Sequence, residues 1–247
     1  MHNEYKRIVE KSNIAVIFIH GILGTPNHFD MLLSLVPEHI SIYNVLLDGH
    51  GKGVKEFSKT SMKKWEEQIE GIVNELCLTH EEIYIVAHSM GCLLALEQSV
   101  KNSKISKMFL ISPPLKLFLK PQMFVNSLKV YIDKINENDK VALAAKRCCG
   151  ISHHKNPFKY FGWIPRFLEL FSKIKQTRGI LNKVSVPCSV YLSCKDEMVS
   201  LSSQKFIKDN SNFLITQLKK SGHFYYEESD LELLKNDFIS FISQKFE

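Results

Sequence analysis

Short apolar runs that suit buried β-strands alternate with segments of helical periodicity along most of this chain. Residues 14–19, Ile-Ala-Val-Ile-Phe-Ile, and residues 83–87 are apolar at nearly every position and rich in β-branched side chains. Such runs are typical of strands that are buried on both faces of a parallel sheet. Further strands are predicted, with decreasing clarity, at residues 108–111, 189–192, 42–47 and 213–218.

The segments between these runs carry apolar side chains on one helical face. Two such faces are clear: Trp65, Ile69, Ile72, Val73 and Leu76, and near the end of the chain Leu231, Leu234, Phe238 and Ile242. Ser229 followed by Glu232 predicts a capping box at the start of the last helix. Strands that alternate with helices predict an α/β fold, with a mostly parallel sheet and helices on both of its faces.

The alternation stops after Ser112-Pro113-Pro114 and resumes near Val186-Pro187. Between these points the sequence combines helical apolar spacing with many aromatic residues, so we predict a helical cap, residues 115–183, inserted into the sheet. Residues 1–114 and 184–247 then form the core. The chain has 247 residues and no linker rich in Pro, Gly or Ser, which favours one folded unit with this insertion.

Positive charge is concentrated in the predicted cap. Residues 115–183 hold 14 Lys and Arg against 4 Asp and Glu, whereas the rest of the chain is slightly acidic. A charge that served solubility alone would spread evenly, so this segregation suggests contact with something anionic. Aromatic side chains interleave with the basic ones, which suits an anionic lipid surface or substrate. A solvated helical face explains the pattern equally well. No nucleic-acid motif is present, and we expect no nucleic acid partner.

Residues 1–13 are polar and mixed in charge, without the apolar core and small-residue cleavage site of a secretory signal. No window approaches the roughly 18 apolar residues that span a bilayer. We therefore expect a cytoplasmic protein in which the six cysteines remain thiols.

Residues 87–91, Ala-His-Ser-Met-Gly, join a predicted buried strand to an apolar helical run. A sharp turn in this context exposes the hydroxyl of its central serine and requires small residues at both ends, so Ser89 is predicted as a nucleophile. The backbone N–H of Met90 would lie at the start of the helix, where it can stabilise an oxyanion. A serine in the first turn of an ordinary helix is the alternative explanation.

Residues 20–24, His-Gly-Ile-Leu-Gly, follow the first strong strand and would lie in a loop beside that turn. Glycines let the backbone approach a substrate, and the N–H of Ile22 is predicted as the second oxyanion donor. For His20 we expect a structural hydrogen bond.

An acid and a base are predicted at the same edge of the sheet, where the carboxyl ends of the strands meet. Asp196 follows the strand predicted at 189–192, and His223 lies between the last strand and the last helix. The order Ser89, Asp196, His223 is the chain order of one of the known serine triads. Taken singly, Asp196 could cap a helix and His223 could lie in a surface loop; Glu197 is the fallback acid.

These motifs, together with Asp48-Gly49-His50-Gly51, Val199 and Ser221-Gly222, give the chain a resemblance to α/β-hydrolases of the carboxylesterase and monoacylglycerol-lipase-like group. The resemblance covers both ends of the chain and implies an α/β-hydrolase fold in which the cap selects the substrate. The cap itself resembles nothing in particular. Little sequence precedes the first strong strand, so the leading antiparallel strands of this fold should be shortened or absent.

The resemblance implies hydrolysis of a small carboxylic ester through an acyl-enzyme, and the apolar cap favours a monoacylglycerol or another lipid-like ester. Two alternatives stay open: a thioesterase or acyltransferase, and a ligand-sensing protein with little turnover. No nucleotide-binding glycine motif occurs, so no cofactor is predicted. Cys148-Cys149 with His153-His154 fits no zinc spacing and lies in a basic segment, so no metal is predicted either.

Overall fold

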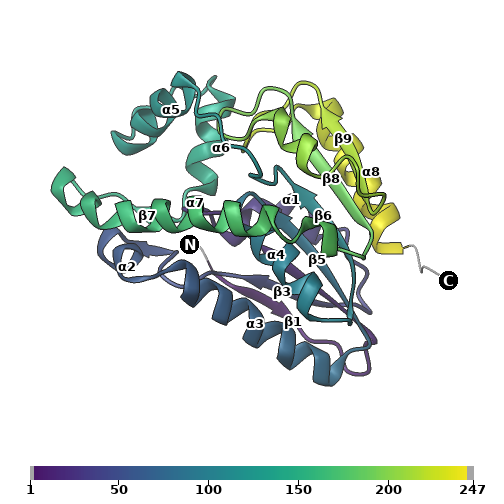
Figure 1. Ribbon diagram of the computed structural model, residues 1–247. Helices are drawn as coiled ribbons and strands as arrows, with labels where there is room; N and C mark the ends of the chain where they lie inside the picture. The colour runs from purple at the N-terminus through teal and green to yellow at the C-terminus, as the bar shows by residue number, and fades with distance from the viewer. Residues whose placement is uncertain (1–2, 244–247) are drawn as a thin grey trace.

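A computed structural model describes residues 3–243, and its centre is a seven-stranded sheet (Figure 1). The strand order is β1-β3-β2-β5-β6-β8-β9, and every neighbouring pair is parallel except β1 with β3. The strands are β1 (Tyr5–Arg7), β2 (Ile14–Ile19), β3 (Ser41–Val45), β5 (Glu82–His88), β6 (Ile105–Ile111), β8 (Cys188–Ser193) and β9 (Phe213–Leu218).

Helices cover both faces of this sheet. Successive side chains of each strand point to opposite sides, so apolar strands present buried side chains to a layer of helices on each face. In β2, for example, Ile17 belongs to one apolar core cluster and Phe18 to the other. The first cluster includes side chains of α3 (Met62–Thr79), α4 (Met90–Lys101) and α7 (Ile164–Arg178). The second includes side chains of α1 (Asp30–Leu33) and α8 (Glu228–Ser243). The predicted fold class is therefore confirmed.

All six predicted strands occur, and the leading antiparallel part is reduced to the three residues of β1. The predicted apolar face of α3 is also present. Trp65, Ile69, Val73 and Leu76 are fully buried, and Ile72 packs against the same core at its margin.

The predicted capping box of the last helix is wrong. Helix α8 begins at Glu228, so Ser229 lies inside its first turn. The loop before the helix supplies the local contacts instead: Ser221 Oγ accepts the N–H of Glu227 at 3.2 Å and donates to Asp230 Oδ2 at 2.7 Å. A side chain of the first turn is thereby tied to the loop that precedes it.

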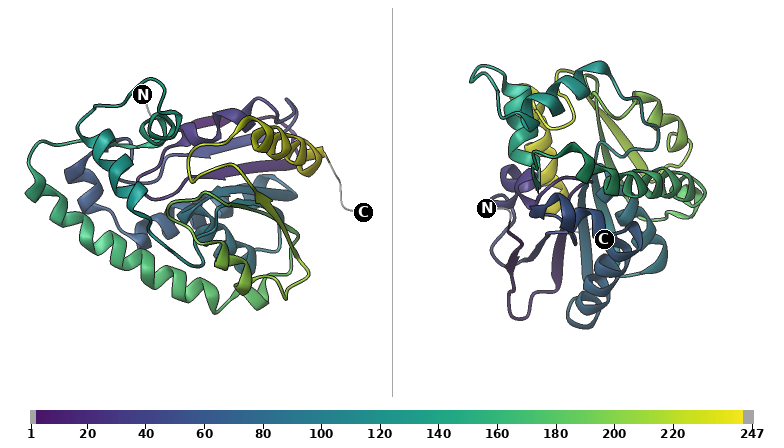
Figure 2. Two further views of the ribbon diagram at one scale, coloured as in Figure 1. Left: turned by 90° about the horizontal axis from the view of Figure 1, so that it is seen from above. Right: turned by 90° about the vertical axis from the view of Figure 1, so that its left-hand side faces the viewer.

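Several elements lie between the adjacent strands β6 and β8. They are α5 (Pro121–Tyr131), α6 (Lys140–Cys148), β7 (Ile151–Ser152), η2 (Pro157–Trp163), α7 and η3 (Leu181–Lys183). Helix α5 packs on α6, which packs on η1 (Pro26–Phe29), and β7 pairs with β4 (Lys52–Gly53). Both η1 and β4 follow carboxyl ends of strands. The elements from α5 to β7, called the insertion below, therefore lie over that edge of the sheet (Figure 2). The remaining short elements are α2 (Val54–Lys59) and η4 (Leu201–Phe206).

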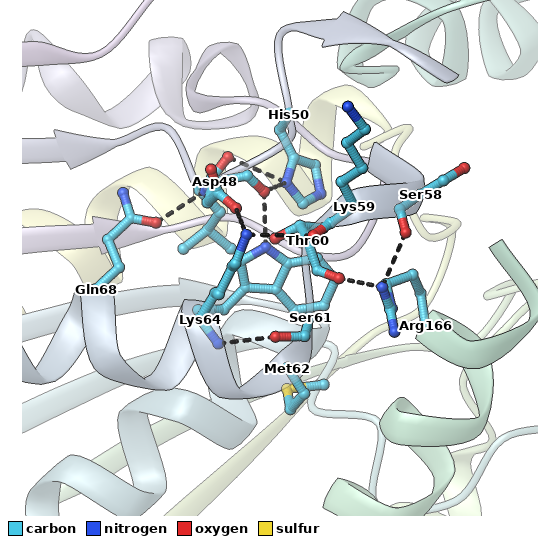
Figure 3. Close-up of polar contacts among 12 residues, drawn as sticks. Asp48, His50, Ser58, Lys59, Thr60, Ser61, Met62, Lys64, Gln68 and Arg166 are labelled. Atoms are coloured by element: carbon cyan, nitrogen blue, oxygen red, sulfur yellow. Dashed lines mark hydrogen bonds and ion pairs between the residues drawn. The ribbon is translucent and has the colours of Figure 1, made fainter. Parts of the chain in front are cut away.

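Helix α7 is fastened to the core by charged side chains. Lys173, which is only 4% exposed, contacts Glu66 of α3 and Glu97 of α4. Arg166 donates to the carbonyls of Ser58 and Thr60 (Figure 3). The helix therefore runs from the insertion onto the face of the sheet. The limits of the cap, residues 115 and 183, remain a prediction from the sequence. Within residues 3–243, no helix is both long and apolar enough to cross a membrane.

Candidate active site

Ser89 lies in a sharp turn between β5 and α4, with φ of 52° and ψ of −124°. This backbone conformation is strained for a residue with a side chain, and such strain is frequent at functional sites. It is held in place because the N–H of Ser89 donates to Ile111 O of β6 at 2.9 Å. A side chain on Gly91 would overlap the carbonyl of Ile19, so the predicted need for a small residue after the serine is met.

Three predicted residues meet at the carboxyl edge of the sheet. His223 Nε2 lies 3.1 Å from Ser89 Oγ, and His223 Nδ1 lies 2.8 Å from Asp196 Oδ2. All three side chains are buried, and Ser89 is the most exposed of them, at 7%. The carboxylate can only accept, so Nδ1 carries a proton and Nε2 is free to accept the hydroxyl proton of Ser89.

Asp196 has a second set of partners besides the imidazole. Its Oδ1 accepts the backbone N–H groups of Met198 and Val199, both at 2.8 Å. Burial would raise the pKa of Asp196, but the charge of His223 and these hydrogen bonds outweigh it, and the pKa lies below its usual value. Burial likewise opposes a charged His223, yet Asp196 and then Glu197 raise the pKa of this histidine above its usual value. The ring is therefore a stronger base than an isolated imidazole.

Glu197, the fallback acid of the sequence analysis, forms its hydrogen bond with the backbone of His223 and not with the imidazole ring. Its Oε2 accepts the backbone N–H of His223 at 3.1 Å. Asp196 is therefore the carboxylate at the ring, and Glu197 has a contact that the sequence did not predict.

The loop of Ile22 lies against the serine. A Cβ on Gly21 would lie 2.8 Å from Ser89 Cβ, so only glycine allows this approach. Gly24 N–H donates to Gly21 O at 3.0 Å and closes the turn that presents Ile22. Among the described residues, the N–H groups of Ile22 and Met90 form none of the loop and turn hydrogen bonds, so both remain available to a ligand.

Two buried histidines support this loop. His20 Nδ1 donates to Gly21 O at 2.8 Å, while its Nε2 accepts the N–H of Leu47 at 3.1 Å. His50 Nε2 accepts the N–H of Leu23 at 3.1 Å, and its Nδ1 faces the carbonyls of Leu47 and Asp48 (Figure 3). Burial lowers the pKa of His50 to about 4. Both rings act as neutral connectors, and His20 has the structural role that was predicted.

Gly150, between α6 and β7, joins the insertion to the same loop. Its N–H donates to Leu23 O at 2.7 Å, and its carbonyl accepts the N–H of Gly51 at 2.7 Å. A side chain on Gly150 would overlap Gly24 O. Sequence reasoning missed this residue, because a glycine directly after a helical run indicates no more than the end of the helix.

A second group of aromatic rings lies behind His223. The ring of His88 stacks on that of His28 at 3.7 Å between centroids, and His88 Nε2 donates to His223 O at 3.1 Å. His28 contacts Tyr226 OH at 3.1 Å and Cys148 Sγ, from α6, at 3.5 Å. Burial and the nearby histidines lower the pKa of His28 to about 3 and that of His88 well below its usual value. These rings therefore form a neutral layer under the site.

Metal ligation finds no support among the described side chains. Within residues 3–243, no group of three or more His, Cys, Asp or Glu residues could hold a metal ion. Cys149 Sγ and His153 Nε2 are 3.9 Å apart, and all six cysteines are free thiols.

Comparisons with known proteins agree with the observed fold. The sequence model of a family described as "Alpha/beta hydrolase family" matches residues 16–235. Among curated proteins, "Probable lysophospholipase BODYGUARD 4" of Arabidopsis thaliana is 34% identical over 112 residues, which are 43% of this chain. The match covers 26% of that protein, so this chain spans about a quarter of its relative's length.

Solved structures share the fold over nearly the whole chain. One described for LipS and LipT, two metagenome-derived lipolytic enzymes, has a TM-score of 0.74 at 17% identity and covers 98% of this chain and 97% of its own. A monoacylglycerol lipase of Paleococcus ferrophilus has a TM-score of 0.69 at 15% identity, covering 98% and 99%. Est1E of Butyrivibrio proteoclasticus, with bound ferulic acid, has a TM-score of 0.65 at 18% identity, covering 97% and 93%. At these identities the likeness shows the fold alone.

Proposed function

Because the chain belongs to the alpha/beta hydrolase family, we propose that it is a serine hydrolase that cleaves carboxylic esters through an acyl-enzyme. One observation carries the proposal. A single imidazole, that of His223, contacts the hydroxyl of Ser89 with one nitrogen and the carboxylate of Asp196 with the other. Family membership alone would not be sufficient, since this fold also serves other functions.

In the proposed reaction, Ser89 Oγ attacks the ester carbonyl while His223 Nε2 takes the hydroxyl proton. The N–H groups of Ile22 and Met90 stabilise the negative charge on the carbonyl oxygen. His223 then gives the proton to the leaving alcohol, and the acyl group stays on the serine. A water molecule, deprotonated by the same imidazole, releases the acid and restores Ser89. Asp196 holds the ring in the required tautomer and stabilises its charged form.

The first experiment is turnover of p-nitrophenyl esters with acyl chains of two to sixteen carbons. We expect Ser89→Ala to lose several orders of magnitude in kcat, because it removes the attacking atom. Ser103→Ala changes an exposed hydroxyl in the turn before β6 and serves as the matched control. Equal activity of parent and Ser89→Ala would refute the proposal. Oxygen and sulfur esters of one acyl chain, compared in parallel, separate an esterase from a thioesterase.

For the substrate, a lipid-like ester is supported by the surface of the insertion. Helix α5 packs on α6 and leaves an apolar stripe in solvent, where Phe124, Val125 and Leu128 are 45–59% exposed. Lys120 and Lys134 lie just before and after this helix. Apolar side chains flanked by lysines suit an interface with anionic lipid, so the proposal includes peripheral contact of the insertion with such a surface. A ligand sensor of slow turnover is the remaining alternative, and rapid multiple turnover would argue against it.

A further inference from the structure

The backbone N–H and the backbone carbonyl of His223 are both hydrogen-bonded to side chains. Its N–H donates to Glu197 Oε2, and its carbonyl accepts from His88 Nε2, each at 3.1 Å. We propose that Glu197 is a positioning residue of the active site, which fixes His223 through its backbone N–H and adds a negative charge beside the imidazole. This inference rests on the proposed function for its meaning in catalysis.

Glu197 can position another residue because its own backbone is fixed. Its carbonyl accepts the N–H of Lys120 at 2.9 Å, and the carbonyl of the next residue, Met198, accepts the N–H of Phe118 at 2.9 Å. A β-bridge between Leu117 and Val199 continues this pairing. The residue is 5% exposed. The segment that enters the insertion therefore braces the loop from which Glu197 reaches the histidine.

The histidine loop is shaped to receive this carboxylate. A Cβ on Gly222 would lie 3.0 Å from Glu197 Oε2, so a side chain at position 222 would crowd the hydrogen bond to His223. The N–H of Gly222 donates to Tyr225 O at 2.8 Å, which closes a turn around the histidine. Lys195 N–H donates to Ser221 O at 3.0 Å, so the two loops are joined on both sides of the Asp196 contact.

Charge gives Glu197 a second effect on His223. Among the described residues, the titratable groups that act on this histidine are Asp196 and Glu197 from the loop after β8, His88 from β5, and His28. Tyr226 contacts His28. Among these, burial keeps His28, His88 and Tyr226 neutral near pH 7. The two carboxylates are then the charges that stabilise the imidazolium, which forms in each half of the reaction.

Two variants separate the hydrogen bond from the charge. Glu197→Gln keeps an oxygen that accepts the N–H of His223 but removes the charge, whereas Glu197→Ala removes both. Glu232→Gln changes an exposed carboxylate on α8 and is the matched control. The first readout is the titration of the His223 imidazole by NMR in the full chain, assigned with a His223→Gln variant. The second is the pH profile of kcat/KM for a p-nitrophenyl ester.

We expect the pKa of His223 to fall by about one unit in both Glu197 variants and to be unchanged in Glu232→Gln. The acid limb of kcat/KM should move to lower pH by the same amount. Above that limb, Glu197→Gln should stay within about tenfold of the parent, and Glu197→Ala should lose about 10²-fold, because a small displacement of a catalytic group is costly.

Unchanged titration of His223 in a folded Glu197→Gln variant would overturn the inference. So would a Glu197→Ala variant that matches the parent in kcat/KM. The NMR titration does not require turnover, so a protein that hydrolyses none of the esters would refute the proposed function and still test the contact. A structural role alone would lower the stability of both variants without moving the pKa of His223.

Discussion

Gly150 donates its backbone N–H to the carbonyl of Leu23, so the insertion is hydrogen-bonded to the residue that follows Ile22. Leu23 itself has φ of 58°, and His50 accepts its N–H. The peptide units on either side of Leu23 are thus held from two different parts of the chain. The position of the proposed oxyanion donor therefore depends on the placement of the insertion.

Gly150→Ala should lower kcat/KM by about 10²-fold, because the new methyl group would overlap Gly24 O and displace the loop. Gly71→Ala is the control: a Cβ at position 71 of α3 meets nothing within 4 Å. That substitution should raise the free energy of unfolding by about 1 kcal/mol. Ester hydrolysis and urea unfolding of both variants check the prediction, which fails if Gly150→Ala keeps full activity.

Asp196→Asn should lower kcat by about 10⁴-fold while the chain stays folded. The N–H groups of Met198 and Val199 both need an acceptor at position 196, so the amide oxygen would turn toward them. Its NH2 group would then face His223 Nδ1 and favour the tautomer with the proton on Nε2, which cannot accept from Ser89. Steady-state kinetics measure the loss, and a loss under tenfold would contradict the assigned role.

Activity should rise with pH and reach a plateau, because neutral His223 is the base. Asp196 and Glu197 raise the pKa of His223 against the effect of burial, so the midpoint of kcat/KM should lie above 6.5. A profile of kcat/KM between pH 5 and 9 tests this. A midpoint below 6.5 would mean that burial dominates.

Acid should destabilise the fold before the carboxylates titrate. The pKa values of His28 and His50 are about 3 and about 4 in the folded chain, so the unfolded chain binds more protons below pH 6.5. Between pH 6.5 and 5 each histidine should cost on the order of 2 kcal/mol of unfolding free energy. His50→Gln should reduce this dependence in urea titrations, and His39→Gln, at an exposed position, should not. Equal slopes for the two variants would contradict the prediction.

Binding to vesicles that contain phosphatidylglycerol should depend on the lysines beside α5. Each lysine near an anionic bilayer contributes about 1 kcal/mol, so Lys120→Glu with Lys134→Glu should weaken binding by about 30-fold or more. Lys63→Glu with Lys208→Glu makes the same charge change at exposed positions outside the insertion. Sedimentation with vesicles compares the two pairs. An equal decrease would indicate a response to net charge alone, without a docking surface.

Much of the fold was predictable because it is encoded in local patterns. Continuous apolar runs such as residues 83–87 identify strands that are buried on both faces, and the spacing of Trp65 and Val73 identifies a helix face. Ser89, Asp196 and His223 were predictable for a related reason: each lies in a turn or loop that follows a strand of the sheet, and parallel strands end at a common edge.

The contacts of Glu197 and Gly150 were not predictable in this way. Each joins segments that are distant in sequence, and neither spacing nor hydrophobic pattern encodes which partner a side chain will meet. Ser229 shows the opposite case. A local pattern predicted a cap at this serine, but the helix begins at Glu228, and Asp230 of its first turn contacts Ser221 of the preceding loop.

Strands β6 and β8 are hydrogen-bonded neighbours, although 76 residues separate Ile111 from Cys188. The chain leaves β6 at the carboxyl edge of the sheet, and α7 carries it back along the sheet to the start of β8. The elements between β6 and α7 therefore begin and end at the same edge. A change in the length of these elements would therefore leave the register of β6 with β8 unaltered. For protein engineering, this makes the stretch between β6 and α7 the natural place to graft a foreign cap, provided that a glycine remains opposite Leu23.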